Sequence, residues 1–120
     1  MQAGDGLERK TGAAWLFAFY GPLLTPNRRE ILRLYLEEDM SLSEIAAEQG
    51  ITRQGVHVAL SRACARLYAL EETLGLAGRF MKTRRGLRAA LDALNAGHAD
   101  VAGELIAEML RRGEEDEDGF

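Results

Sequence analysis

The sequence predicts an all-α protein with a helix-turn-helix at its centre. Three observations lead to this prediction: apolar residues recur every three or four positions along most of the chain, helix-capping residues stand at the ends of these stretches, and no alternating strand pattern competes with them. Of the 120 residues, 47% are hydrophobic and only 2 are Pro, so the chain can bury a core and is not globally disordered. This length suits one ordinary domain and leaves little room for a separate catalytic module.

The N-terminal part is expected to change from a loose segment to a helix within the first twenty residues. Residues 1–12 contain three glycines and few apolar positions, which predicts a flexible N-terminal arm. Residues 13–20 are rich in aromatic side chains and predict a short helix that ends at Gly21-Pro22. Thr25 as N-cap and Pro at the first helical position predict a second helix over residues 26–38, whose apolar face is buried.

The next two helices are marked by their capping residues. Ser41 and Glu44 stand at the spacing of a capping box, in which each side chain accepts a hydrogen bond from an open backbone N–H. Gly50 can end this short helix in the left-handed conformation. Thr52 can then cap a longer helix that begins at Arg53 and extends to about residue 75.

Residues 42–61 have the spacing of a helix-turn-helix. Ala46 stands where the two helices cross and a larger side chain would separate them, while Gly50 makes the sharp turn. Ile51 and Val56 are expected to pin the second helix against the first, with Ile45 buried beneath them. The residues from 13 to 76 are therefore expected to form one helix-turn-helix domain.

The outward face of the second helix is the candidate nucleic-acid-binding surface. Arg53 or Gln54 could bond two groups on a base edge, whereas Arg62 and Arg66, one turn apart, could contact phosphates, and His57 suits either role. The full candidate set is Arg53, Gln54, His57, Ser61, Arg62 and Arg66. The alternative is a helix-turn-helix used as scaffold, with ordinary surface charges, since a fold does not fix a function.

The C-terminal third predicts two amphipathic helices and an acidic end. Residues 77–112 form a helical extension whose apolar positions recur over 80–94 and 101–110, separated by Asn95-Ala96-Gly97. These helices need a partner face, which is either a second copy in a homodimer or the chain itself. Residues 113–120 form a tail that we expect to be disordered because of its charge.

Charge is distributed unevenly along the chain. The net charge is −4, but residues 114–118 supply five of the 19 acids. Residues 30–49 hold six acids against Arg33 alone, whereas residues 53–88 hold seven Arg and one Lys against two Glu. A local anionic partner is therefore compatible with the acidic total, because surface charges act over about 10 Å. The acidic tail could also imitate nucleic acid and restrain the basic face.

The sequence lacks the motifs of common enzyme sites. No Gly-rich phosphate loop with a Lys, no His-Glu-x-x-His helix and no nucleophile elbow occurs, so we expect no catalysis, cofactor or metal. The single Cys64 excludes an intrachain disulfide and is expected to be a buried, inert thiol. With no secretory signal and no apolar stretch long enough to span a bilayer, a cytoplasmic location is expected.

Residues 19–76 resemble the YlxM family of small bacterial helix-turn-helix proteins. The residues that carry the resemblance are Phe19-Tyr20-Gly21, Leu34-Tyr35, Ser41 to Ala46, Arg53-Gln54 and Val56-His57. The same stretch is similar, more distantly, to the promoter-reading C-terminal domain of bacterial sigma factors. The resemblance implies a nucleic-acid-binding regulatory accessory factor of the signal recognition particle pathway, with the particle's RNA or DNA, and its GTPase, as partners.

Other functions remain open at this point, and three positions depart from the expected patterns. The alternatives are a DNA-binding transcriptional regulator independent of the particle and a structural dimerisation module without nucleic-acid binding. Gln49 stands where a helix-turn-helix usually has an apolar residue. Gly55 stands where the family typically has Ala, and Val58 where an acidic residue often follows the His.

Overall fold

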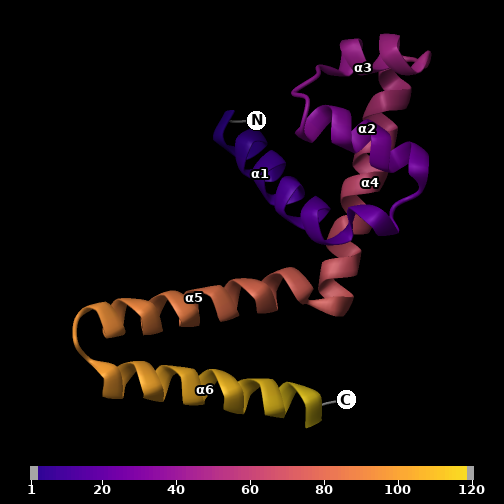
Figure 1. The fold of residues 1–120 in the computed structure, drawn as a ribbon. Helices are drawn as coiled ribbons and strands as arrows, with labels where there is room; N and C mark the ends of the chain where they lie inside the picture. The colour runs from indigo at the N-terminus through magenta and orange to yellow at the C-terminus, as the bar shows by residue number, and fades with distance from the viewer. Residues whose placement is uncertain (1–2, 119–120) are drawn as a thin grey trace. The chain divides into compact units, whose positions relative to one another are not determined.

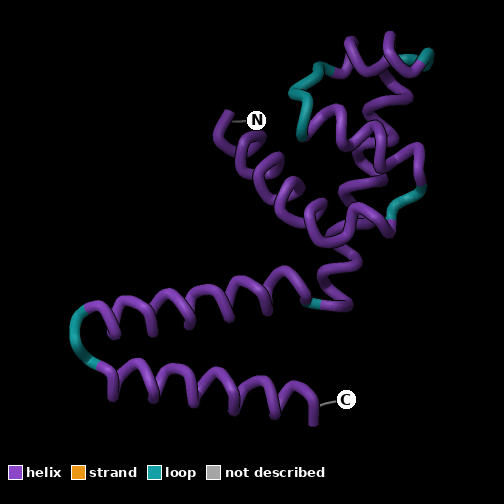
Figure 2. The backbone as a smooth tube through the Cα atoms, in the orientation of Figure 1, coloured by secondary structure: helices purple, strands orange, loops and turns teal. Residues whose placement is uncertain are grey.

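The computed structural model describes residues 3–118 and confirms the all-α prediction. Within this range the structure holds α-helices and one short 3-10 turn, and no strand (Figure 1, Figure 2). The elements in chain order are α1 (Ala3–Tyr20), the 3-10 turn η1 (Gly21–Leu23), α2 (Pro26–Leu36), α3 (Leu42–Gln49), α4 (Arg53–Leu74), α5 (Leu76–Asn95) and α6 (Ala99–Asp118). None of the described helices is long and apolar enough to cross a membrane.

The chain divides into two compact units, which are described separately. The first unit is Met1–Ala77 and contains α1 to α4, and the second is Gly78–Phe120 and contains most of α5 and all of α6. The helix-turn-helix lies in the first unit, so the candidate site is built from that unit alone.

Helix α4 is the central element of the first unit. It packs against α1, α2 and α3, and its residues Val56, Ala63 and Leu67 are completely buried. Leu32 of α2 and Ile45 of α3 are equally buried in the same cluster. Fully burying such a side chain contributes roughly 1.5 to 3 kcal/mol, so this cluster fixes the position of α3 on α4.

The predicted helix caps around α3 and α4 are confirmed. The Ser41 hydroxyl accepts from the Glu44 N–H at 3.1 Å, and the Glu44 carboxylate accepts from the Ser41 N–H at 3.1 Å. Gly50 has a φ of 67°, the left-handed C-cap conformation. The Thr52 hydroxyl accepts from the Gly55 N–H at 2.9 Å and caps α4.

Helix α2 begins where the sequence predicts but without the expected side-chain cap. Thr25 is its N-cap, yet the Thr25 hydroxyl makes no capping hydrogen bond. Pro26 occupies the first turn, and because Pro has no N–H this end has one donor fewer to satisfy. The helix ends at Leu36, not at residue 38, and Asp39 takes a positive φ of 53°.

The N-terminal segment differs from the expectation of a flexible arm. Helix α1 begins at Ala3, so residues 3–12 are helical; residues 1 and 2 of the expected arm lie outside the described range. Lys10 explains part of this difference, because its ammonium pairs with the Asp39 carboxylate at 2.8 Å and lies 4.6 Å from the centre of the Tyr35 ring. These contacts tie the helix to α2, and the strong helix formers around residue 10 allow it to extend.

The acidic end also differs from the expectation of disorder. Helix α6 runs to Asp118, so residues 113–118 are helical, while residues 119 and 120 of the expected tail lie outside the described range. Glu108 pairs with Arg111 and, at 3.4 Å, with Arg112, one turn apart on the helix surface. Glu is a good helix former, so a helix supported by these pairs can continue into the acidic run.

Helices α5 and α6 form an antiparallel hairpin in the second unit (Figure 1). The Met109 side chain of α6 packs against Gly86 of α5, where a Cβ would lie 2.5 Å from the Met109 sulfur. Ala90 of α5 and Ala102 of α6 are buried to within a few per cent. Small residues on this line allow the two helices to lie close together.

Candidate nucleic-acid interface

The helix-turn-helix is formed by α3, the turn at residues 50–52 and the first half of α4. Ala46, on the α3 face that packs against α4, is 9% exposed, and Val56 of α4 is fully buried, as the spacing predicts. The turn closes through the backbone, since the Ile51 N–H donates to the Ala46 carbonyl at 3.1 Å. Gln49 is half-buried, and among the described residues no buried side-chain nitrogen or oxygen lacks a partner.

The expectation that the Ile51 side chain pins the second helix is wrong. Ile51 is 41% exposed and lies outside the buried cluster. Val56 and Ile45 provide the apolar contact between the two helices, so the turn needs only the backbone bond of Ile51. The side chain instead lies over the start of α4, where its Cδ1 is 3.7 Å from the position that a Cβ of Gly55 would take.

The candidate residues of α4 all lie on its solvent side. These exposed residues are Arg53, Gln54, His57, Ser61, Arg62 and Arg66. Successive residues of a helix are turned by about 100°, which sorts this face into three lines. Arg53 and His57 lie along one flank, Gln54 and Ser61 along the middle, and the other two arginines along the opposite flank.

This arrangement separates two kinds of contact. Gln54, like Arg53, stands in the first turn of α4, the part of a recognition helix that meets base edges, whereas Ser61 lies about two turns further along. The two flanks carry the arginines, with Arg53 on one flank and Arg62 and Arg66 on the other. Arg53 stands at the helix N-terminus, whose partial positive charge adds to its own attraction for an anion.

The acids of α4 lie at its C-terminal end, beyond the candidate residues. The first turn of α4 contains no acidic residue, and Glu71 and Glu72 stand at the far end of the helix. At 1.5 Å per residue they are roughly 27 Å from Arg53 along the axis, well beyond a Debye length. The N-terminal half of α4 therefore carries Arg53 and Arg62 and no acidic residue of its own.

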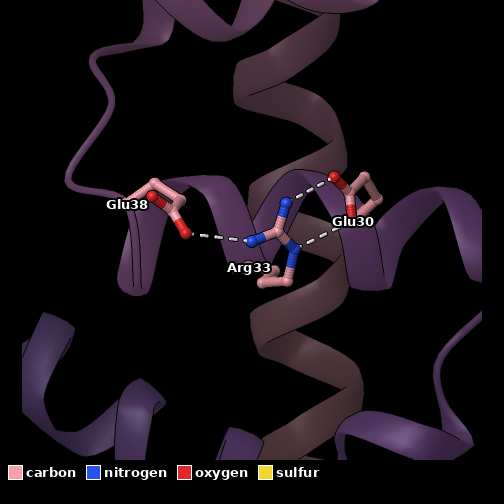
Figure 3. A network of polar contacts seen from close by, with 3 residues as sticks. All are labelled: Glu30, Arg33 and Glu38. Atoms are coloured by element: carbon pink, nitrogen blue, oxygen red, sulfur yellow. Dashed lines mark hydrogen bonds and ion pairs between the residues drawn. The ribbon is translucent and has the colours of Figure 1, made fainter.

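Arg33, the single arginine of the acidic segment 30–49, is bound to acidic side chains of α2 and the residues that follow it (Figure 3). The Arg33 guanidinium donates to both oxygens of Glu30, at 2.8 and 3.0 Å, and to Glu38 at 3.1 Å. The bond from Arg33 lowers the pKa of Glu30, and Glu30 in turn raises the pKa of Arg33. Arg33 is therefore held by acidic side chains of its own unit.

The structure gives a physical reading of Gly55. A Cβ at this position would approach the Thr52 hydroxyl oxygen to 3.2 Å, which is tighter than usual, and this oxygen is the acceptor that caps α4. Gly55 therefore leaves room for the cap at the start of the helix. Val58, the other departure from the family pattern, is half-buried beside the exposed His57.

Sequence reasoning missed a polar cluster at the base of the unit. Tyr20 is completely buried, and its hydroxyl donates to the Glu71 carboxylate and accepts from the Leu76 N–H. The same carboxylate oxygen accepts from the Ala77 N–H at 3.0 Å. The available signal was Tyr20 itself, because a phenol among core residues needs a hydrogen-bond partner.

The remaining chemistry-bearing residues form no constellation in the described part of the chain. Residues 3–118 contain no group of three or more His, Cys, Asp or Glu side chains that could hold a metal ion. Cys64 is half-buried, and burial raises the pKa of its thiol, which disfavours the reactive thiolate. His98, Glu44 and Glu48 are exposed.

Comparison with known proteins gives a consistent family. The family model described as "Putative helix-turn-helix protein, YlxM / p13 like", UPF0122, matches residues 7–102. A UPF0122 protein of Symbiobacterium thermophilum is 38% identical over 96 residues, covering 80% of this chain and 90% of that protein. A UPF0122 protein of Acetivibrio thermocellus is 42% identical over 104 residues, covering 86% and 88%. The chain therefore belongs to the UPF0122 family of YlxM/p13-like helix-turn-helix proteins.

Proposed function

We propose that this protein binds nucleic acid through the outward face of α4 and acts as a regulator without catalytic activity. One observation carries the proposal. The six candidate side chains are all exposed on one face, and within residues 3–118 no described hydrogen bond or ion pair occupies them. A positive helix face free of internal partners is suited to a polyanion.

The six residues have separate roles in this proposal. Arg53 and Gln54 contact base edges, while Arg62 and Arg66 contact phosphates. His57 and Ser61 lie between these groups and add contacts to bases or backbone. Affinity comes mainly from the arginines, and selectivity comes from the first turn of α4.

We place the protein in the cytoplasm, as a regulatory accessory factor of the signal recognition particle pathway. The support is the YlxM-like sequence of residues 19–76 together with membership of the YlxM/p13-like family. The particle's RNA is then the nucleic-acid partner, and its GTPase is a protein partner.

A second candidate function is a structural module that joins two copies of the chain. It is favoured by the exposed leucines of α5, which the two-helix hairpin leaves uncovered. A homodimer is also compatible with nucleic-acid binding, because helix-turn-helix proteins commonly bind as pairs.

A third candidate function is a DNA-binding transcriptional regulator that is independent of the signal recognition particle. It differs from the first proposal only in its nucleic-acid target.

Fluorescence anisotropy with the full chain separates these functions. Labelled signal-recognition-particle RNA, alone or with its GTPase, is titrated at several salt concentrations, and duplex DNA is added as competitor. In a plot of the logarithm of the binding constant against the logarithm of the salt concentration, each phosphate contact contributes a slope of about −0.9 for duplex and about −0.7 for a single strand. Preference for the RNA supports the particle role and preference for DNA supports transcription, whereas no binding to either overturns the proposal.

Arg29→Ala is a matched control for these titrations. Arg29 is an exposed arginine of the same unit on α2, next to the acidic Glu30. Its removal changes the net charge as an α4 variant does, but it leaves the α4 face intact. Equal losses for Arg29→Ala and Arg62→Ala would indicate non-specific attraction and contradict a binding face on α4.

A further inference from the structure

The hairpin of α5 and α6 exposes a row of large apolar side chains. Leu87, Leu91 and Leu94 of α5 are 55, 50 and 51% exposed, and Ile106 and Leu110 of α6 are 42 and 65% exposed. Residues of this kind normally lie inside a protein. They recur at spacings of three and four, so on each helix they form one continuous stripe.

The two stripes lie on the same broad side of the hairpin. On α5 the leucines are turned by about 100° from the contact line through Gly86 and Ala90. On α6, Ile106 and Leu110 are turned by roughly 40° to 80° from the line through Ala102 and Met109. Because the helices are antiparallel, these rotations bring both stripes to the same side. We name this surface, made of Leu87, Leu91, Leu94, Ile106 and Leu110, the hairpin face.

The size of the hairpin face fits a protein interface. The exposed fractions of its five side chains correspond to an apolar area on the order of 450 Å², within the range of the largest patches on monomers, which are often functional. A stable interface buries about 800 Å² per partner, and the long charged side chains at the edges can supply the remainder. The face is therefore large enough to form the centre of a dimer interface.

Charge indicates how a second copy would lie. Over residues 76–95 the sequence has five cations and one acid, whereas residues 99–118 have eight acids and two cations. Two identical faces related by a two-fold axis along the helices would place α5 of each copy over α6 of the other, basic on acidic. The other two-fold arrangement would place α5 over α5 and bring the arginines together.

The edges of the face agree with the first arrangement. Arg84 and Arg88 line the outer edge of α5, beside the leucine stripe. Gly86 and Met109 lie side by side, so heights along the hairpin axis can be counted from them at 1.5 Å per residue. Arg84 and Glu114 then differ in height by less than one helical turn. The same is true of Arg88 and Glu104. These cations can therefore meet acids of a second copy, whereas their own α6 lies on the opposite side of α5.

We propose that the hairpin face binds the hairpin face of a second copy of this chain, with α5 of each copy antiparallel to α6 of the other in a four-helix bundle. This inference specifies the interface of the homodimer in the proposed function. It rests on dimer formation and does not depend on nucleic-acid binding. Its tests measure molecular mass, so their failure leaves nucleic-acid binding untouched.

The first test is sedimentation equilibrium of the full chain and of Leu91→Asp. The wild type is expected to be a dimer, and the aspartate is expected to raise the dimer dissociation constant by at least about thirtyfold, the effect of losing a central contact. Circular dichroism must show equal helix content in both proteins. Ala89→Asp, at an exposed position of α5 on the opposite broad side of the hairpin, provides a comparison with the same added charge. A monomeric wild type at high micromolar concentration overturns the proposal.

The second test uses reversed charges at the edges and does not disturb the leucines. One variant carries Arg84→Glu and Arg88→Glu, and the other carries Glu104→Arg and Glu114→Arg. Each alone is expected to dimerise at least about tenfold more weakly, and an equimolar mixture is expected to form a heterodimer with near wild-type affinity. A dimer that is equally strong in each variant and shows no preference in the mixture overturns the pairing of α5 with α6.

Discussion

The hydroxyl of Tyr20 donates to the Glu71 carboxylate at 2.5 Å and joins the end of α1 to the end of α4. Burial, and then the bond to Glu71, raises the pKa of the Tyr20 phenol. The same two side chains accept from the N–H groups of Leu76 and Ala77 at 3.0 Å. Two residues 51 positions apart thereby fix how the last turn of the central helix ends.

Tyr20→Phe is expected to lower the thermal unfolding midpoint of the first unit. The change removes one partner each from the half-buried Glu71 carboxylate and the Leu76 N–H, and a polar group shielded from water without a partner costs stability. Tyr68→Phe, at a tyrosine that is 49% exposed, is the matched control and should change the midpoint little. Calorimetry of the two variants beside the wild type checks this. Equal midpoints for Tyr20→Phe and the wild type would contradict a stabilising role for the cluster.

Substitutions of Gly50 should destabilise in an order set by backbone conformation. Its φ of 67° is costly for residues with a Cβ, and no atom lies within 4 Å of the added Cβ, so strain alone decides the outcome. We expect Gly50→Asn to cost least, Gly50→Ala about 1 kcal/mol, and the β-branched Gly50→Val most. Urea unfolding measures the order. An unchanged stability for Gly50→Val would contradict a left-handed turn at this position.

The capping box should make stability depend on acid pH. Hydrogen bonds from Ser41 lower the pKa of Glu44 in the folded protein. The folded state therefore favours the ionised Glu44 carboxylate. Its contribution to the stability of the fold is fully present above the pKa of the unfolded chain, and it is lost as the pH falls through the lower pKa of the folded protein. Glu44→Gln should cost stability at pH 6 and progressively less toward pH 3.

The measurement for the capping box is the unfolding free energy in urea between pH 3 and pH 6. Glu48→Gln, on the exposed side of the same helix, is the control and should show no such convergence with the wild type. A cost of Glu44→Gln that stays constant with pH would mean that the ionised carboxylate has no special role in the cap.

The α4 variants should differ in how they weaken binding. Arg53→Ala and Gln54→Ala remove contacts in the first turn and are expected to cost about 1 to 3 kcal/mol and to reduce discrimination between sequences. Arg62→Ala is expected to weaken binding to all sequences and to reduce the salt slope by about 1. All three side chains are exposed, so folding should be unaffected. Unchanged affinity in all three variants would remove the recognition-helix proposal.

Local features could be predicted from the sequence, whereas long-range ones could not. The caps at Ser41 and Thr52 and the turn at Gly50 depend on neighbours within a few residues, and each was predicted and confirmed. The Tyr20–Glu71 bond and the Lys10–Asp39 pair join distant segments, which no local pattern indicates. The helical residues 3–12 depend partly on that second pair, which explains why composition alone favoured a loose arm.

The candidate site follows the same division. Helical periodicity was enough to predict which side of α4 faces solvent, because Val56, Leu60 and Ala63 define the buried side. The exposed Ile51 could not be predicted, since its burial depends on how α3 and α4 cross. The roles of the six exposed residues stay predictions, because exposure makes contact possible without selecting a ligand.

The acidic end offers a test of restraint on binding. If the charged run imitates nucleic acid, removing residues 114–120 should tighten nucleic-acid binding at low salt, and the gain should disappear at high salt, where such attraction is screened. A truncation after residue 118 serves as the control, because it keeps all five acids. Unchanged affinity at low salt would dispose of the restraint.

The most direct test of the central claim is NMR of the full chain titrated with the nucleic acid that anisotropy selects. We predict that the largest changes in backbone amide chemical shift occur within residues 53–66 of α4, and that the amide chemical shifts of α2 change little. Saturating binding with no shifts in residues 53–66 would contradict a recognition face on α4.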